Sequence, residues 1–149
     1  MAKGFTLIEM MLVLVIAAMM AGVAAPNLMP AIASARFRSA VDDVVSGLRF
    51  VRSEALIQGH ESIFALDIEH HAYRLSGKNR IYNLPDSVEL ELFTAEQERQ
   101  GESQGGIRFY PDGSSTGGRI TMTGAGRREY VDVSWLTGAI VARHAGTGS

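Results

Sequence analysis

The sequence has no cysteine and almost no excess of either charge. Without cysteine there is no disulfide framework and no Cys-ligated zinc or iron–sulfur site. Fourteen Lys and Arg against sixteen Asp and Glu give a formal charge of −2, which excludes broad electrostatic binding of nucleic acid. The 149 residues make one domain with room for an appended segment, and the apolar fraction of 46% is too high for a disordered chain.

Charge is also missing locally. No charged side chain occurs from Met10 to Ala35, and Met, Leu, Val, Ile and Ala make up nearly all of the run to residue 25. As an α-helix, residues 5–25 would rise about 31 Å, close to the roughly 30 Å of a bilayer's hydrocarbon core. The remainder of the chain has an ordinary soluble composition. The sequence therefore predicts a membrane-length segment followed by a soluble part.

Glu9, inside the apolar segment, separates the possible interpretations of that segment. A secretory signal peptide needs a basic start and a small-x-small cleavage site, which Lys3 and Val23-Ala24-Ala25 supply, but its apolar core has no use for a carboxylate. A plain signal anchor meets the same objection, because a carboxylate near the bilayer centre costs roughly 2.5–3.5 kcal/mol, and somewhat less near the interface. Glu9 therefore either snorkels to the headgroups or has a partner within the membrane.

The start of the chain resembles the class III signal of type IV pilins and pseudopilins in the run Gly4-Phe5-Thr6-Leu7-Ile8-Glu9-Met10. The resemblance implies that a prepilin peptidase removes residues 1–4 by cutting between Gly4 and Phe5, and N-methylates Phe5. It also implies that Glu9 meets the terminal amine of a neighbouring subunit. Opposite charges buried together in lipid are far less costly than either one alone. The family places such a chain in the bacterial inner membrane as a single-pass protein, with the leader in the cytoplasm and the C-terminal domain in the periplasm.

The helical pattern continues over residues 26–58. Pro26 and Pro30 lie at its start, and each removes a backbone donor and clashes with the carbonyl four residues earlier, so we expect residues 22–30 to bend or partly unwind. Farther on, apolar residues recur at spacings of four and three, which predicts one buried stripe. The stripe is Phe37, Val41, Val44, Leu48, Val51 and Ala55. We expect the helix to end near Gln58, with Gly59 as its cap.

Residues 59–149 are expected to form a β-rich domain. Short alternating segments predict strands at 62–68, 72–75, 87–93, 107–110, 119–123, 129–135 and 139–143. In the strand 129–135, Val131, Val133 and Trp135 are expected to share one apolar face. Residues 95–106, rich in Glu, Gln, Ser and Gly, predict a mobile surface loop.

Antiparallel hairpins with one polar and one apolar face predict a sheet that lies on the helix stripe. The predicted fold class is therefore α+β. It consists of a long, kinked N-terminal helix, transmembrane in its first half, packed on an antiparallel β-sheet. With the N-terminal motif, this arrangement is pilin-like.

A second resemblance narrows the family. The segment Phe109-Tyr110-Pro111-Asp112-Gly113-Ser114-Ser115-Thr116-Gly117-Gly118, followed by Ile120-Thr121-Met122, is similar to the turn and strand of the H-type minor pseudopilins of type II secretion (the GspH family) and of the FimT/FimU minor pilins. The first family implies a structural subunit near the tip of a short periplasmic pseudopilus that drives export of folded proteins. Its implied partners are the prepilin peptidase, the other minor pseudopilins, the major pseudopilin and the inner-membrane assembly platform. The alternative is a type IV pilus minor pilin that binds DNA during uptake.

No motif for catalysis or for a cofactor is present. The four histidines lack the carboxylate–histidine spacing of a metal site, and the adjacent pair His70 and His71 is interpreted as a solvated turn. The other two are His60 and His144. No Gly-x-Ser-x-Gly elbow, phosphate loop or calcium loop occurs. We therefore expect no enzyme activity, no cofactor, no metal and no small-molecule substrate.

Three arginines offer the only candidate for nucleic-acid binding. Arg127, Arg128 and Arg143 would form a small basic patch if the last strands bring them together. Glu129 and Asp132 lie beside them, which favours solvated arginines with local acidic partners. DNA binding is therefore the less favoured interpretation.

Overall fold

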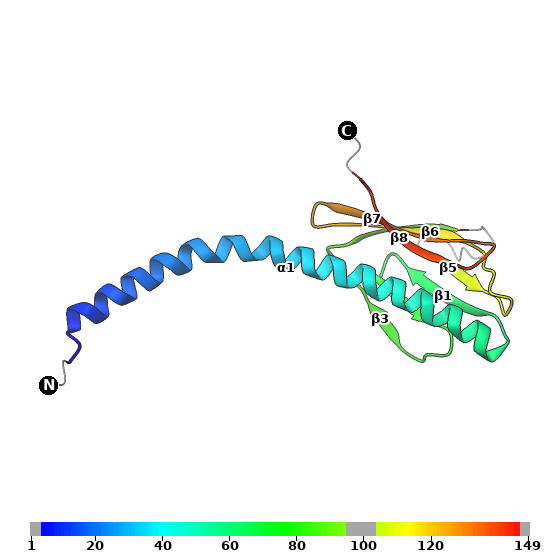
Figure 1. Ribbon diagram of the computed structural model, residues 1–149, viewed down its shortest axis with the longest axis horizontal. Helices are drawn as coiled ribbons and strands as arrows, with labels where there is room; N and C mark the ends of the chain where they lie inside the picture. Colours follow the sequence, from blue (N-terminus) through cyan, green and yellow to red (C-terminus); the bar gives the residue numbers. More distant parts are fainter. Residues whose placement is uncertain (1–3, 95–103, 147–149) are drawn as a thin grey trace.

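The computed structural model describes residues 4–94 and 104–146, and it leaves the side chains of residues 23–28 undescribed. One long helix, α1 (Leu7–Gln58), joins a globular part in which eight strands are described. Figure 1 shows the helix as a bowed rod whose second half lies on the β-structure and whose first half projects away from it. The strands are β1 (Ser62–Asp67), β2 (Ala72–Leu75), β3 (Ile81–Asn83), β4 (Glu89–Thr94), β5 (Gln104–Phe109), β6 (Gly118–Gly124), β7 (Arg127–Val133) and β8 (Ile140–His144).

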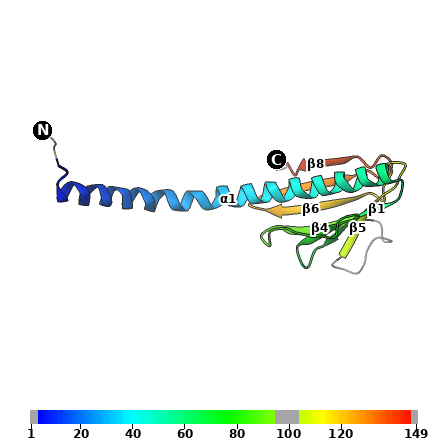
Figure 2. The ribbon, with the colours of Figure 1, turned by 90° about the horizontal axis from the view of Figure 1, so that it is seen from below.

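The strands form two antiparallel four-stranded sheets. One has the order β3-β2-β1-β5 and the other the order β4-β6-β7-β8. The second half of α1 contacts β1 and β5 of the first sheet and β6, β7 and β8 of the second. Figure 2, turned by 90°, shows strands of both sheets alongside this same half of the helix. The core therefore lies between one helix face and two sheets.

The predicted apolar stripe on α1 is confirmed. All six of its residues are buried, and they pack with Phe64 of β1, Ile107 of β5 and Ile120 of β6. The predicted end of the helix is confirmed as well. Gly59 takes the left-handed conformation, with φ of 69°, and its N–H donates to the carbonyl of Ala55 at 3.1 Å. A residue with a β-carbon is strained in that conformation, so glycine ends the helix there.

The helix is continuous past both prolines. It runs from Leu7 to Gln58 as one element, so the partial unwinding expected near residues 22–30 is not present. Each proline removes only one backbone donor, and the hydrogen bonds on either side of it keep the chain helical. Pro26 lies among the residues whose side chains are not described, and the kink at Pro26 and Pro30 stays a prediction.

The β-domain corrects the sequence-based expectation of a single sheet. Hairpin patterns predict which neighbours along the chain pair, but the strands separate into two sheets because β1 pairs with β5, and β4 with β6. The three-residue strand β3 was not predicted, since three residues are too few to show an alternation. Trp135 does not share the buried face of Val131 and Val133, because β7 ends at Val133 and the indole is 68% exposed.

The loop expected at 95–106 is also corrected. Residues 104–106 belong to β5, and the rest of that segment, 95–103, lies outside the described residues. The two glycines that suggested a loop lie where neighbouring strands pack closely. A β-carbon on Gly105 would lie 2.6 Å from Cδ2 of Leu92 in β4, and one on Gly106 would lie 3.1 Å from Cγ2 of Ile63 in β1. Glycine here reflects the close approach of neighbouring strands.

Candidate functional site

The first turn of α1 is held by a side-chain cap. Thr6 precedes the helix in an extended conformation, and its Oγ1 accepts a hydrogen bond from the backbone N–H of Glu9 at 3.3 Å. The spacing Thr6-x-x-Glu9 is that of a capping box, in which a hydroxyl and an acidic residue mark the helix start. The cap therefore fixes Glu9 in the first turn, close to the positive end of the helix dipole.

Gly4 and Phe5 lie just outside the helix. Neither belongs to α1, both are exposed, and the Phe5 side chain is 75% exposed. A β-carbon on Gly4 would meet no atom within 4 Å. Nothing in the described chain therefore requires glycine at this position, and the peptide bond between Gly4 and Phe5 is open to another protein.

The helix that follows is apolar on every side and is not covered by the β-domain. From Leu7 to Met20 its large apolar side chains are 44–83% exposed, with Leu7 and Ile8 among the most exposed. A helix that is hydrophobic all round is typical of a membrane span or of burial among other helices. Within the described residues, no helix is long and apolar enough to cross a membrane. The predicted segment 5–25 extends into residues 23–28, which lie outside that description.

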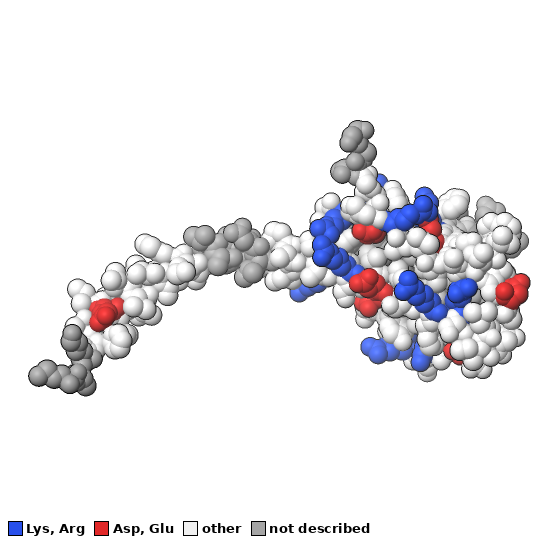
Figure 3. Space-filling model, in the orientation of Figure 1, with Lys and Arg blue, Asp and Glu red and all other residues white. Residues whose placement is uncertain are grey.

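Glu9 is the one charged residue between Gly4 and Ala35. Figure 3 shows acidic surface near the start of an otherwise uncharged rod. The Glu9 side chain is exposed, and within the described part of the chain no side chain bonds its carboxylate. An unpaired carboxylate among apolar groups is costly unless a cation from outside the chain neutralises it. The arrangement thus presents one acid and an apolar surface to another molecule.

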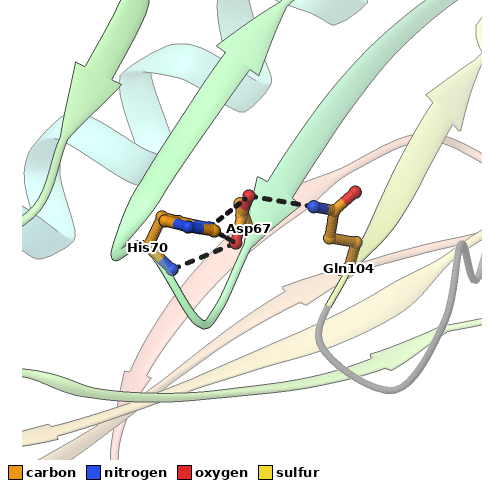
Figure 4. A network of polar contacts seen from close by, with 3 residues as sticks. All are labelled: Asp67, His70 and Gln104. Atoms are coloured by element: carbon orange, nitrogen blue, oxygen red, sulfur yellow. Dashed lines mark hydrogen bonds and ion pairs between the residues drawn. The ribbon is translucent and has the colours of Figure 1, made fainter.

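The four histidines occupy three separate places: the link from α1 to β1 (His60), the turn after β1 (His70 and His71) and the end of β8 (His144). His70 and His71 occupy the turn between β1 and β2, as predicted, and Figure 4 shows how that turn is tied down. Asp67 accepts hydrogen bonds from the backbone N–H of His70 at 3.0 Å and from Nε2 of Gln104 at 3.0 Å. The backbone N–H of His70 is the largest influence that lowers the pKa of Asp67. This network joins the turn to β5, and the Asp67–His70 spacing alone could have predicted its first half.

The candidate nucleic-acid patch of Arg127, Arg128 and Arg143 is partly neutralised, at Arg143. Asp132 is bonded to Nε of Arg119 and to Nη2 of Arg143, each at 2.5 Å. The hydrogen bond from Arg119 is the main reason that the pKa of Asp132 is lowered. Arg143 is therefore not free to meet a phosphate, whereas Arg128 bonds only the hydroxyl of Thr123, at 3.3 Å, in the described part of the chain. No sequence pattern indicates that Arg119 joins Asp132 from a neighbouring strand, because the contact depends on the register of β6 and β7.

A capped helix whose first half is apolar apart from one acid, and whose second half packs on antiparallel sheets, defines a pilin-like protein. The start of the chain agrees with this class, because residues 1–25 match the prokaryotic N-terminal methylation motif. Residues 40–138 match the family model described as type II transport protein GspH. The chain belongs to the GspH family.

Known relatives support the same assignment. The type II secretion system protein H of Xanthomonas campestris pv. campestris is 35% identical over 138 residues, which cover 93% of this chain and 81% of the relative. The minor pseudopilin EpsH of the Vibrio cholerae type 2 secretion system has a TM-score of 0.56 at 13% identity, over 72% of this chain and 95% of EpsH. The type IV minor pilin FimU of Pseudomonas aeruginosa has a TM-score of 0.54 at 13% identity, over 71% and 91%. The last two likenesses show the fold alone.

Proposed function

We propose that the chain is a minor pseudopilin of the type II secretion system, a structural subunit near the tip of a periplasmic pseudopilus that drives export of folded proteins. The observation that carries this proposal is that one chain matches both the methylation motif and the GspH family model. A methylation motif lies on an exposed apolar helix, and a GspH match covers the domain beyond it. The relative from Xanthomonas, which bears the name of a secretion component, adds support.

Processing is assigned to the segment before the helix. A prepilin peptidase removes residues 1–4 between Gly4 and Phe5 and methylates the new amino group of Phe5. Support comes from the exposure of both residues and from the open space that the described residues leave around Gly4. Residues 5–25 then anchor the chain in the inner membrane as a single pass, residues 26–58 lead out of it, and residues 59–149 lie in the periplasm.

Assembly is assigned to Glu9 and to the apolar helix around it. In the filament the Glu9 carboxylate meets the terminal amine of a neighbouring subunit, while the surrounding apolar side chains pack against other helices. The ion pair neutralises a charge that is costly in lipid, and the helix packing buries apolar side chains that are exposed in the single chain. The partners are the other minor pseudopilins, the major pseudopilin and the inner-membrane assembly platform. The role is structural and needs no cofactor, metal or small-molecule substrate.

Two measurements test the proposal together. Mass spectrometry of the mature protein should find a chain that begins at N-methylated Phe5. A strain that lacks the chain should retain its exported proteins in the periplasm and should recover export when the gene is returned. A functional chain that keeps its first four residues, or normal export without the chain, contradicts the proposal.

A second candidate is a type IV pilus minor pilin, because the fold likeness to FimU is close to that to EpsH. The two candidates differ in what the deletion strain loses. Loss of pili or of DNA uptake with normal protein export favours the pilus. Loss of export with normal pili favours type II secretion.

A further inference from the structure

Four arginines that are far apart in the sequence gather where the apolar helix enters the globular part. Arg36 and Arg38 flank the buried Phe37 on α1, and both are exposed. The hairpin between β6 and β7 reaches the same level, since a β-carbon on Gly124 would lie 2.8 Å from Cδ2 of Phe37. Arg127 and Arg128 follow directly in β7. Figure 3 shows Lys and Arg side chains gathered at this end of the globular part.

These four residues, here called the basic collar, are poorly neutralised by the chain itself. Within the described residues no carboxylate forms an ion pair with any of them, whereas Arg119 and Arg143 share Asp132. Acids lie close by. Asp42 and Asp43 follow Arg38 by about one helical turn, Asp86 and Glu89 stand before and in β4, and Glu129 is already bound by His144 at 2.8 Å. Three of the four guanidinium groups are exposed, Arg127 is half-buried, and none is ion-paired within the described chain.

The position of the collar along the helix matches the far surface of a bilayer. The uncharged run from Met10 to Ala35 comprises 26 residues, which rise about 39 Å as a helix. A bilayer with its headgroup regions is about 40–45 Å thick. Before assembly, with Glu9 at one interface and the span therefore shifted a few residues beyond the 5–25 segment, Arg36 and Arg38 lie at the headgroups of the other surface. The hairpin places Arg127 and Arg128 at that same level.

We infer that the basic collar rests on anionic phospholipid headgroups and holds the globular part against the membrane surface before the subunit enters a filament. The inference depends on the proposed membrane anchor and adds a second, electrostatic contact to it. Guanidinium groups bind phosphate through paired hydrogen bonds, and an anionic lipid surface attracts each arginine independently. A membrane is favoured over nucleic acid because the apolar helix leaves the domain at this end and brings the bilayer to the collar.

The experiment uses the full chain in vesicles of phosphatidylcholine alone or mixed in equal parts with anionic phosphatidylglycerol. Since the sequence has no cysteine, single cysteines can carry a nitroxide whose depth is read by collision with oxygen and with a nickel chelate. Ala125→Cys marks the exposed hairpin tip. Leu136→Cys marks the opposite end of the globular part. Leu136 is next to Thr137, whose carbonyl accepts a hydrogen bond from Arg52 at 3.2 Å. Ala17→Cys reports whether the apolar helix is inserted.

The nitroxide at position 125 should lie at headgroup depth in the anionic vesicles and in water in the neutral ones, while position 136 stays in water in both. High salt should return the nitroxide at position 125 to water, because salt screens exposed charges. Arg127→Gln with Arg128→Gln should lower the ratio of docked to free hairpin about fivefold per arginine. The matched pair Arg49→Gln with Arg74→Gln, both exposed and away from the collar, should leave it unchanged.

Equal depth of position 125 in the two kinds of vesicle overturns the inference. So does retention of a DNA duplex by the detergent-solubilised chain that needs Arg127 and Arg128 while the depth stays insensitive to lipid charge. A nitroxide at position 17 that never reaches the hydrocarbon contradicts the membrane anchor itself, and with it the collar's role. A nitroxide at position 17 that inserts normally, with an unresponsive position 125, contradicts the collar alone.

Discussion

At the scale of single residues, Gly4 and Glu9 are informative because the described fold does not need their side-chain chemistry. Gly4 faces open space, and the Glu9 carboxylate has no bonded partner in the part of the chain that the structure describes. Buried residues such as Leu48 are explained by their neighbours, whereas these two require another molecule to explain them. The peptidase recognition that we propose at Gly4 and the charge pairing that we propose at Glu9 would supply that explanation.

Replacing Glu9 with alanine should leave cleavage intact and prevent assembly. The Thr6 cap still receives the backbone N–H at position 9, so the helix starts as before. The neighbouring subunit's amine, however, loses the carboxylate that neutralises it in an apolar setting. Mass spectrometry should find the mature N-terminus unchanged, while export should fall to the level of the deletion strain.

Asp42→Asn is the control for that substitution, because Asp42 is an exposed acid on the same helix outside the apolar segment. It should assemble normally. If Glu9→Ala also supports normal export, the pairing of Glu9 with a neighbouring amine is wrong.

Asp132→Asn should weaken the β-domain in a pH-dependent way. Arg119 and Arg143 lower the pKa of the Asp132 carboxyl in the folded state. The stabilisation is therefore complete above the ordinary carboxyl pKa of about 3.9 and disappears as the pH falls through the lowered folded-state value. Because both guanidinium groups are half-exposed or more, we expect about 1 kcal/mol at pH 7.

Urea unfolding of the wild type and the variant between pH 7 and pH 2 measures this difference. The two stabilities should converge at the acid end. Asp86→Asn, at an exposed turn, is the control and should change stability little. A difference that stays constant over the whole pH range would show that Asp132 acts through packing or backbone contacts instead.

At the scale of the element, α1 serves two environments along a single helix. Its second half buries one stripe against two sheets, and its first half is exposed on every side. A change of periodicity near residue 32 marks the transition, because a one-sided stripe fits a sheet surface and an all-round apolar surface fits lipid or a bundle of helices. The same substitution should therefore have different effects in the two halves.

Leu48→Ala should destabilise the domain by about 2–5 kcal/mol, because Leu48 is fully buried and its truncation leaves a cavity. Leu14→Ala, on the same helix but 68% exposed, should change the stability by less than about 0.5 kcal/mol. Thermal unfolding of the full chain in mild detergent, followed by near-UV circular dichroism, compares the two. Equal losses would mean that the first half of the helix also packs on the domain.

Periodicity explains which elements the sequence predicted well. The helix stripe consists of six residues at spacings of four and three, and Gly59 ends the helix by a local rule, so both are predictable from the sequence. The place of Gly105 in a strand could not be predicted, because glycine there depends on Leu92, which approaches from another strand. The split into two sheets was missed for the same cause, since the pairing of β1 with β5 joins segments about 40 residues apart. The motif around Gly4 and Glu9 was found from resemblance, whereas the Asp132 cluster needed the register of three strands.

At the scale of the whole molecule, the chain divides into a domain with its own core and an apolar helical segment that this domain does not cover. The core comes from the second half of α1 and from strands of both sheets, and its first member along the chain is Phe37. The large side chains before it, Met29 and Ile32 included, are 44–83% exposed wherever they are described. The domain therefore has little reason to depend on its anchor for stability, which suits a subunit that must leave a membrane and enter a filament in the same folded state.

A chain that begins at Met29 should therefore fold as a soluble monomer and unfold cooperatively. Its melting temperature should lie within about 5 °C of that of the full chain in detergent, a difference that corresponds to roughly 1 kcal/mol for a domain of this size. Size-exclusion chromatography and thermal unfolding measure both properties. In the same shortened chain, Leu48→Ala should still lower the melting temperature sharply, because the cavity it leaves lies wholly within the retained core. Aggregation or a non-cooperative transition of the shortened chain would show that the apolar half of the helix supports the domain, and the division of the molecule into anchor and independent domain would then be wrong.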